Sequence, residues 1–309
     1  MRTKENKNYT VRFLITLAMA SLLIFIIGKN RPEPISSQIL KEKFWSDKVH
    51  SKEKFEIIFS GDSRLYRGID PKTVSDRVDG LSVLNFGFSS GGHNKIIFDE
   101  VNNKLDFLSK TKVVVLVITP HSLTPNAQEN SHFLQEMQRN ESDIFNRRYI
   151  NPFFNFFEPI KPMELLQFKQ EQSGYFERFN KNGWVASWKI PTNQQVGIQK
   201  YAKDFENNKV KTSILKELYN QIRVWEDDGI QVFAFRIPSS IEMEKLENDL
   251  SNFDEKELIK GIENAGGEWI RIDKRFEYNS YDGSHLVKSD AIKLSEKLGD
   301  ILKKRFKNL

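Results

Sequence analysis

Short apolar runs rich in β-branched and aromatic residues alternate with longer amphipathic stretches along most of this 309-residue chain. The apolar runs predict strands at residues 55–60, 81–86, 113–119, 231–237 and 268–272. The amphipathic stretches predict helices at residues 95–108, 214–228, 254–265 and 289–306. Strands that alternate with helices favour a parallel sheet covered on both faces. We therefore expect a three-layer α/β/α sandwich with a flavodoxin-like parallel sheet of about five strands.

The N-terminal region contains one almost wholly apolar run at residues 11–27, VRFLITLAMASLLIFII, with Arg12 near its start. Its length is at the low end of what spans a bilayer as a helix. Basic residues are more frequent before and within the start of the run than after it, which predicts a cytoplasmic N-terminus and an extracytoplasmic remainder. We expect residues 1–28 to be a cytoplasmic tail and an uncleaved transmembrane anchor.

Two alternatives remain for this apolar run. The segment at residues 18–20, Ala-Met-Ala, is similar to a signal-peptide cleavage site, although it lies in the middle of the run. A cleaved signal peptide would export the rest of the chain just as an anchor would. The other alternative is a core helix, but a terminal run without a polar face would be hard to bury in a small domain.

The remaining chain divides into a short connecting region and one large domain. Residues 29–54 are expected to form a stalk containing two prolines, followed by a short helix that Ser37 caps and that ends near residue 49. Residues 55–309 are expected to form the α/β domain. Within it, residues 120–208 are rich in aromatic side chains without a clear period, and we interpret them as an insertion over the edge that binds ligands. A satellite hydrophobic cluster beneath a long loop is the alternative.

Composition excludes several kinds of site. The chain has no cysteine, so disulfides, thiolate zinc sites and a cysteine nucleophile are impossible. The net charge of +5 is modest, and much of it is concentrated near the two ends of the chain. This distribution disfavours a nucleic-acid groove, which normally combines basic and aromatic residues along one strip.

Two short motifs occupy positions that suit nucleophilic catalysis. Gly61-Asp62-Ser63 directly follows the first expected strand, where a serine hydroxyl lies at the top of the sheet and its N–H lies near a helix N-terminus. Tyr281-Asp282-Gly283-Ser284-His285 lies between the last expected strand and the last helix, so one loop supplies a base and a carboxylate that orients it. Each motif alone also fits an ordinary turn, but the two positions together favour a catalytic site.

The sequence resembles the SGNH (GDSL-like) hydrolase superfamily in these two motifs, which match its blocks I and V. The resemblance covers roughly residues 55–119 and 231–309 and omits the aromatic-rich insertion. It implies that Ser63 is the nucleophile and an oxyanion donor, that His285 is the general base and then the acid, and that Asp282 orients His285. The reaction would proceed through an acyl-serine intermediate without a metal or organic cofactor.

The middle blocks of the superfamily match less well. Residues 85–92 read NFGFSSGG, so Ser90 takes the place of the block II glycine without a gap, and Gly91 takes it with one inserted residue. The block III asparagine is absent, because the third expected strand leads into Thr-Pro-His-Ser at residues 119–122. His121 is our first choice as the replacement donor, ahead of Thr119 and Ser122, since a neutral imidazole can donate. The alternative is that His121 only caps the turn.

The resemblance also implies a function and partners. It predicts a membrane-anchored, extracytoplasmic serine esterase or O-acyltransferase that acts on acyl esters of a cell-envelope polysaccharide or a related glycopolymer, with a membrane acyl-donor protein as a further partner and no nucleic acid. Arg64 and Arg67 follow the nucleophile and are candidates for binding an anionic substrate group, although arginines at a helix start are commonly solvated or paired. The alternative function is a non-catalytic scaffold or binding component of a polysaccharide modification or export complex.

Overall fold

A five-stranded parallel sheet forms the centre of the protein. The structure is a computed structural model that describes residues 2–29, 37, 39–156 and 174–306. The sheet order is β2-β1-β3-β6-β7, and every neighbouring pair is parallel. Its strands are β1 (Ile57–Gly61), β2 (Val83–Gly87), β3 (Val113–Ile118), β6 (Gln231–Arg236) and β7 (Glu268–Trp269). The expected flavodoxin-like parallel sheet is therefore confirmed.

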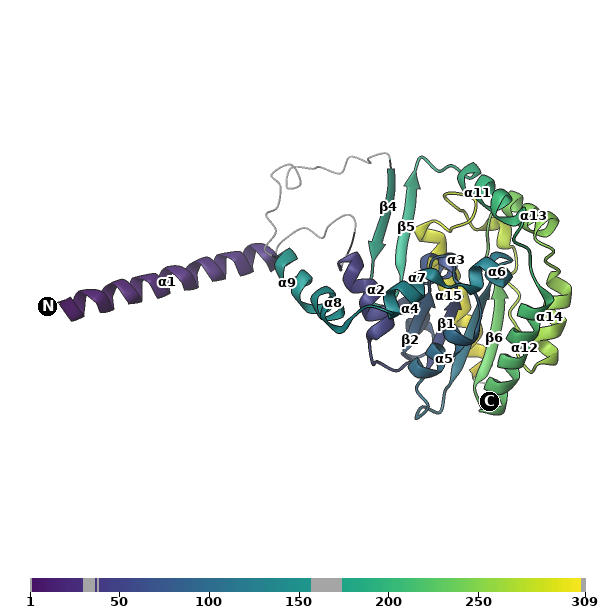
Figure 1. The fold of residues 1–309 in the computed structure, drawn as a ribbon, viewed down its shortest axis with the longest axis horizontal. Coiled ribbons are helices and arrows are strands. Elements are labelled where there is room, and N and C mark those ends of the chain that lie inside the picture. Colours follow the sequence, from purple (N-terminus) through teal and green to yellow (C-terminus); the bar gives the residue numbers. More distant parts are fainter. Residues whose placement is uncertain (1, 30–36, 38, 157–173, 307–309) are drawn as a thin grey trace.

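Burial on both faces explains why the strands are continuously apolar. All six residues of β3, VVVLVI, are buried, as is usual for strands that are covered on both sides. Successive side chains point to opposite faces, so Ile57 and Phe59 belong to one hydrophobic cluster and Ile58 belongs to the other. Figure 1 shows helices on both sides of the sheet, which confirms the three-layer sandwich.

Each face of the sheet has its own set of helices. One cluster includes buried residues of α2 (Lys41–His50), α5 (Lys95–Lys104), α12 (Thr212–Asp227) and α14 (Glu255–Asn264). The other cluster includes buried residues of α3 (Ser63–Gly68), α4 (Pro71–Arg77) and α15 (Lys288–Phe306). The expected helices thus exist, and α13 (Ile241–Leu250) is an additional helix between β6 and α14. Close packing in these two apolar layers holds the sheet rigidly. Side chains at the ends of its strands are therefore held in defined positions.

The N-terminal region is one helix, α1 (Arg2–Lys29). Several of its described apolar side chains, including Phe13, Leu14 and Leu22, are more than half exposed. Judged by length and apolarity together, no helix among the described residues qualifies as a membrane span. The anchor expected at residues 1–28 stays a prediction.

The region after α1 corrects one expectation. Helix α2 begins at Lys41, and its N-cap residue Leu40 makes no side-chain cap. Ser37 is therefore not the cap, and its hydroxyl instead accepts a hydrogen bond from the Phe179 N–H at 3.5 Å. The rest of the expected stalk, residues 30–36, lies outside the described residues. Phe44 and Trp45 of α2 are buried, as its apolar pattern predicts.

The insertion at residues 120–208 contains more regular structure than the sequence indicated. It includes the short helices η1 (His121–Leu123), α6 (Pro125–Gln128), α7 (Ser131–Met137), α8 (Glu141–Phe145), η2 (Asn146–Ile150) and α9 (Asn151–Phe156), and the longer α11 (Gln195–Phe205). It also includes an antiparallel hairpin of β4 (Gly174–Phe179) and β5 (Val185–Ile190). Val185 and Trp184 of the hairpin enter the two main hydrophobic clusters, so the insertion is integrated into the domain.

Candidate active site

Ser63 stands at the junction between the first strand and the helix that follows it. Strand β1 ends at Gly61, Asp62 is the N-cap residue, and Ser63 is the first residue of α3. The Asp62 carboxylate accepts hydrogen bonds from the Arg64 N–H at 2.9 Å and from the Thr119 hydroxyl at 2.6 Å. Asp62 therefore holds the turn, and the Ser63 side chain is left at the carboxyl edge of the sheet, where ligands bind in this class of fold.

The structure brings Ser63, His285 and Asp282 into one hydrogen-bonded chain. The Ser63 Oγ lies 2.9 Å from His285 Nε2, and His285 Nδ1 lies 2.8 Å from Asp282 Oδ2. The other carboxylate oxygen of Asp282 accepts the backbone N–H groups of Ser284 at 2.9 Å and His285 at 2.8 Å. A carboxylate partner at Nδ1 favours the tautomer whose Nε2 accepts a proton from the serine hydroxyl.

The electrostatic environment suits a neutral base. Burial lowers the pKa of the His285 imidazole below its ordinary value of 6.5, although the nearby Asp282 carboxylate acts in the opposite direction. Burial opposes the charge on Asp282, but His285 and the two backbone N–H donors hold its pKa well below the usual range. At neutral pH the pair is therefore an imidazole beside a carboxylate, which is the state that can remove a proton from Ser63.

A cavity of about 180 Å³ opens over this hydrogen-bonded chain. The α/β part of the domain contributes Ser63, Tyr66, Arg67, Ser89, Ser90, Asp282, Ser284 and His285 to its lining, and η1 at the start of the insertion contributes His121. Helix α11 of the insertion contributes Val196, Gly197, Lys200, Tyr201 and Asp204. Helix α11 thus forms one wall of the cavity.

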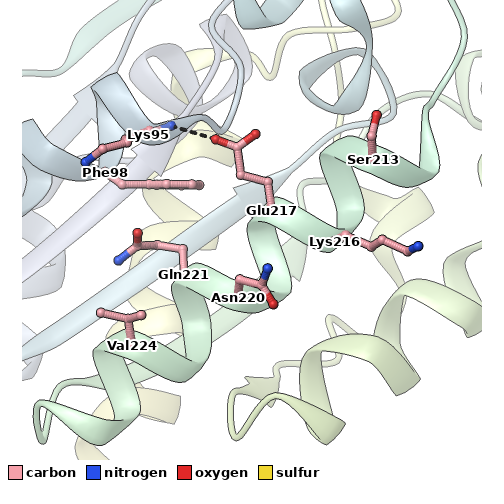
Figure 2. A pocket seen from close by; sticks show the side chains of 8 residues that line it. All are labelled: Lys95, Phe98, Ser213, Lys216, Glu217, Asn220, Gln221 and Val224. Atoms are coloured by element: carbon pink, nitrogen blue, oxygen red, sulfur yellow. Dashed lines mark hydrogen bonds between the residues drawn. The ribbon is translucent and has the colours of Figure 1, made fainter.

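A larger hollow of about 430 Å³ lies elsewhere, between α5 and α12 (Figure 2). The Lys95 backbone N–H donates to Glu217 at 3.1 Å across it, and Phe98 also lines it. Its lining contains no histidine and no serine paired with a base. We therefore assign the chemistry to the smaller cavity.

The candidate oxyanion donors are placed unequally. Ser90 lines the cavity and has a positive φ of 53°, which turns the chain sharply after β2. The Gly91 N–H donates to the Phe88 carbonyl at 3.2 Å, and Gly91 is not among the lining residues. Of the two alternatives for the block II donor, the structure therefore favours Ser90. We call residues 88–91 the oxyanion loop.

His121 also lies at the cavity, at the start of η1. Burial lowers the pKa of its imidazole, so it is neutral at pH 7. Its Nδ1 is buried and has no hydrogen-bond partner within the part of the chain that the structure describes. Thr119 and Ser122 do not line the cavity, and their hydroxyls are engaged with Asp62 and with the Thr119 carbonyl, respectively. Among the three alternatives, His121 is the one positioned to contact a substrate.

The two arginines after the nucleophile have different surroundings. Arg64 has 1% of its surface exposed, forms a salt bridge with Glu247, and donates from Nε to the Ser284 hydroxyl at 2.8 Å. Arg64 is not a lining residue, which corrects its expected contact with substrate. Arg67 does line the cavity, with its guanidinium paired to Glu177 at 3.0 Å and to the Tyr281 hydroxyl at 3.1 Å.

Sequence reasoning missed several residues near the base. The Tyr281 ring is nearly parallel to the His285 imidazole, with 5.8 Å between ring centroids and 13° between planes. The Ser187 hydroxyl of β5 donates to the Tyr281 hydroxyl at 3.1 Å. Lys200, Tyr201 and Asp204 belong to no motif, and the amphipathic period of residues 195–205 was the only available signal for their helix.

Comparisons with known proteins add a likeness at the level of solved structures only. No protein-family model matches the sequence, and no curated protein matches it. Similar solved structures include two carbohydrate acetylesterases from Sinorhizobium meliloti, with 11% and 7% sequence identity and a TM-score of 0.36 for each. Each alignment covers 80% of this chain, and 98% and 97% of the other chain, respectively. We therefore infer the chemistry from the site residues themselves.

Proposed function

We propose that this protein is a serine esterase or O-acyltransferase that acts on a small acyl ester of a carbohydrate. The observation that carries the proposal is the hydrogen-bonded chain from the Ser63 hydroxyl through His285 to Asp282, with 2.9 Å and 2.8 Å between the bonded atoms. This arrangement has the geometry of a nucleophile, a base and an orienting carboxylate. The cavity of about 180 Å³ beside it suits a small acyl group.

In the first half of the reaction, Ser63 attacks the ester carbonyl. His285 Nε2 accepts the hydroxyl proton as the bond from Oγ to carbon forms, and Asp282 stabilises the resulting imidazolium. The negative charge on the carbonyl oxygen is met by the Ser63 N–H at the start of α3, the Ser90 N–H and the His121 imidazole. Collapse of the intermediate breaks the bond to the alcohol, which leaves with the proton from His285.

In the second half, a hydroxyl compound attacks the acyl-serine. His285 removes a proton from water in an esterase, or from a carbohydrate hydroxyl in a transferase, as the new bond to the acyl carbon forms. The bond between the acyl carbon and Ser63 Oγ then breaks, and His285 returns the proton to Oγ. Helix α11 forms one wall of the cavity beside the serine, and a covered site of this kind supports transfer because exclusion of water favours it over hydrolysis. The absence of the block III asparagine also supports transfer, because the usual hydrolytic site uses that side chain as an oxyanion donor.

The cellular setting is also part of the proposal. We place the α/β domain outside the cytoplasmic membrane, held by residues 1–28, and we infer a cell-envelope glycopolymer as its substrate. The support is the apolar run at residues 11–27 and the excess of basic residues at its start. Proteolysis of intact cells tests the location, since an extracytoplasmic domain is degraded by external protease and a cytoplasmic one is protected.

The enzymatic proposal is tested with the purified full-length chain. The chain is incubated with p-nitrophenyl acetate and, separately, with a fluorophosphonate probe that labels activated serines. We expect hydrolysis and covalent labelling that are both abolished by Ser63→Ala and by His285→Ala. Ser89→Ala is the matched control, because Ser89 lines the same cavity and takes no part in the proposed steps.

Two results separate the alternatives. Labelling that persists in Ser63→Ala would place the reactive group elsewhere. A wild-type chain that neither hydrolyses the ester nor reacts with the probe would favour the non-catalytic scaffold. Adding an oligosaccharide acceptor distinguishes transfer from hydrolysis, since only transfer yields an acylated oligosaccharide that mass spectrometry detects.

A further inference from the structure

One lysine is buried beside the candidate site without taking part in the hydrogen-bonded chain. Lys48 belongs to α2 and has 5% of its surface exposed. Its amino group donates to the Gly87 carbonyl at 2.9 Å and to the Gly183 carbonyl at 3.1 Å. It forms no salt bridge with a carboxylate of the described residues. Its two backbone partners come from β2 and from the turn between β4 and β5.

Aromatic rings surround the same amino group. The centroids of the Phe44, Trp45, Tyr66 and Phe88 rings lie between 5.2 and 5.6 Å from Nζ. Rings attract a cation through their faces, although the burial itself disfavours the charge and lowers the pKa of Lys48 well below its usual value. An apolar side chain would fill this space without that cost, so the packing of the core does not by itself account for a lysine.

Gly87, whose carbonyl accepts a hydrogen bond from Lys48, immediately precedes the oxyanion loop. Gly87 also touches the nucleophile turn, where a Cβ added to it would come within 2.8 Å of the Asp62 carbonyl oxygen and 2.9 Å of the Tyr66 nitrogen. The next residue, Phe88, donates its N–H to the Gly61 carbonyl at 3.2 Å. How Gly87 is held therefore contributes to the separation between the Ser90 N–H and the Ser63 side chain.

We propose that Lys48 is a positioning residue that holds the oxyanion loop against the nucleophile turn and links it to the β4–β5 hairpin. The catalytic part of this role rests on the proposed function. Lys48 touches no substrate. It acts through Gly87, and the aromatic rings restrict the amino group to the one place from which it reaches both carbonyls. An oxyanion donor is effective only when it is already in place, so a shift of this loop should slow acyl transfer without weakening substrate binding.

A second buried lysine provides a matched control. Lys104 has 4% of its surface exposed and donates to the carbonyls of Val49 and Ser51 at 2.9 and 3.0 Å. It therefore has the same chemistry as Lys48, but it holds the C-terminal end of α2 instead of the oxyanion loop. Lys48→Met and Lys104→Met each remove one buried amino group and keep a side chain of similar length.

The test compares the two variants in the full-length chain by kinetics and by hydrogen exchange. We expect Lys48→Met to lower kcat for p-nitrophenyl acetate by roughly ten-fold or more with little change in KM, since removing a whole oxyanion donor costs about 10²–10³-fold. Backbone amides of residues 88–91 should exchange faster in Lys48→Met than in wild type. Lys104→Met should leave both quantities near the wild-type values.

Each outcome decides the proposal. Unchanged kcat and unchanged exchange at residues 88–91 in Lys48→Met would overturn it, as would equal losses in the two variants, which would indicate general loosening of α2. If the wild-type chain has no activity, the proposed function fails, and hydrogen exchange alone decides whether Lys48 holds the loop. If Lys48→Met does not fold, Lys48→Gln replaces it, because the amide NH₂ can still donate to a carbonyl and should give a smaller change in the same direction.

Discussion

The nucleophile turn at residues 61–64 and the histidine loop at residues 280–286 meet at one site but are held in different ways. The turn is short and regular, because β1 ends at Gly61 and α3 begins at Ser63 with Asp62 as its cap. Its key contact, from the Asp62 carboxylate to the Arg64 N–H, joins residues two apart. The position of the serine thus depends mainly on the local strand-to-helix junction, with the Thr119 hydroxyl as one distant partner of Asp62.

The histidine loop depends on distant elements instead. The Asp282 carbonyl accepts the N–H of Gly197 in α11 at 2.9 Å, and the Gly283 carbonyl accepts the Ser240 N–H at 3.0 Å. The Ser284 hydroxyl accepts a hydrogen bond from the Arg64 guanidinium at 2.8 Å. The histidine loop is therefore held by backbone contacts from α11 and from Ser240, the N-cap residue of α13, and by the Arg64 side chain. Substitutions far away in sequence should therefore displace His285 more readily than Ser63.

The largest fall in kcat should come from replacing the Asp282 carboxylate of the histidine loop. Asp282→Asn keeps the shape of the side chain but favours the wrong imidazole tautomer, and we expect kcat to fall by about 10⁴-fold. Esterase assays across pH measure the loss. Asp204→Asn is the control, since Asp204 lines the same cavity without contacting His285. A loss in Asp282→Asn no larger than in Asp204→Asn would contradict the orienting role.

The next largest effect should come from removing Arg64, which links the nucleophile turn to the histidine loop. Arg64→Met leaves Glu247 buried with one of its two arginine partners removed, and it takes one hydrogen-bond partner from the Ser284 hydroxyl. Removing one member of a buried pair typically costs about 3–5 kcal/mol, so the free energy of unfolding should fall by that order and kcat should fall with it. Urea unfolding measures the first quantity. Arg77→Met, which breaks exposed pairs with Glu296 and Asp300, should cost less than about 1 kcal/mol.

A smaller effect should separate the histidine loop from the insertion. A Cβ added at Gly197 would come within 2.4 Å of the Asp282 carbonyl oxygen, so Gly197→Ala must displace the loop or α11. We expect kcat to fall roughly ten-fold, because displacing catalytic groups by even a fraction of an ångström slows the reaction. The rate of fluorophosphonate labelling should fall in parallel. Wild-type rates in Gly197→Ala would mean that α11 does not support the base.

The smallest effect is expected in the pH dependence. Because burial lowers the pKa of His285, the folded protein should stay active below pH 6.5 and lose activity only as the imidazole becomes protonated at lower pH. The unfolded chain binds that proton near pH 6.5, so stability should decrease as pH falls through the same window. Burial lowers the pKa of His93 to about 4, which adds to this decrease. An acidic limb of kcat/KM above pH 6.5 would contradict the neutral, buried base.

Much of the α/β core could be predicted from the sequence. Strand β3 is apolar at every position because both faces of the sheet are covered, and such a run is visible without knowledge of its neighbours. The β4–β5 hairpin was missed, although Asn182-Gly183 between two alternating runs is a recognised hairpin signal. Aromatic residues on both sides of this turn obscured the alternation, since some of them pack against α2 and others face outward.

The site was predicted in part for the same reason. Ser63, Asp282 and His285 belong to motifs whose residues are near neighbours, so their local turns are encoded within a few positions. Arg64 has no such signal. Its role as a buried link to Ser284 and Glu247 depends on α13 and on the histidine loop, neither of which is near it in sequence.

The sequence by itself determined where the five strands of the parallel sheet and most of the helices around it form, because those preferences depend on side chains a few positions apart. Only the tertiary structure decided that Ser63 and His285, separated by 222 positions, lie 2.9 Å apart. It also decided that Ser90 instead of Gly91 lines the cavity and that Lys48 reaches Gly87. Such contacts depend on how whole layers of helices and strands pack against one another. No local sequence pattern specifies distances between these layers to a fraction of an ångström.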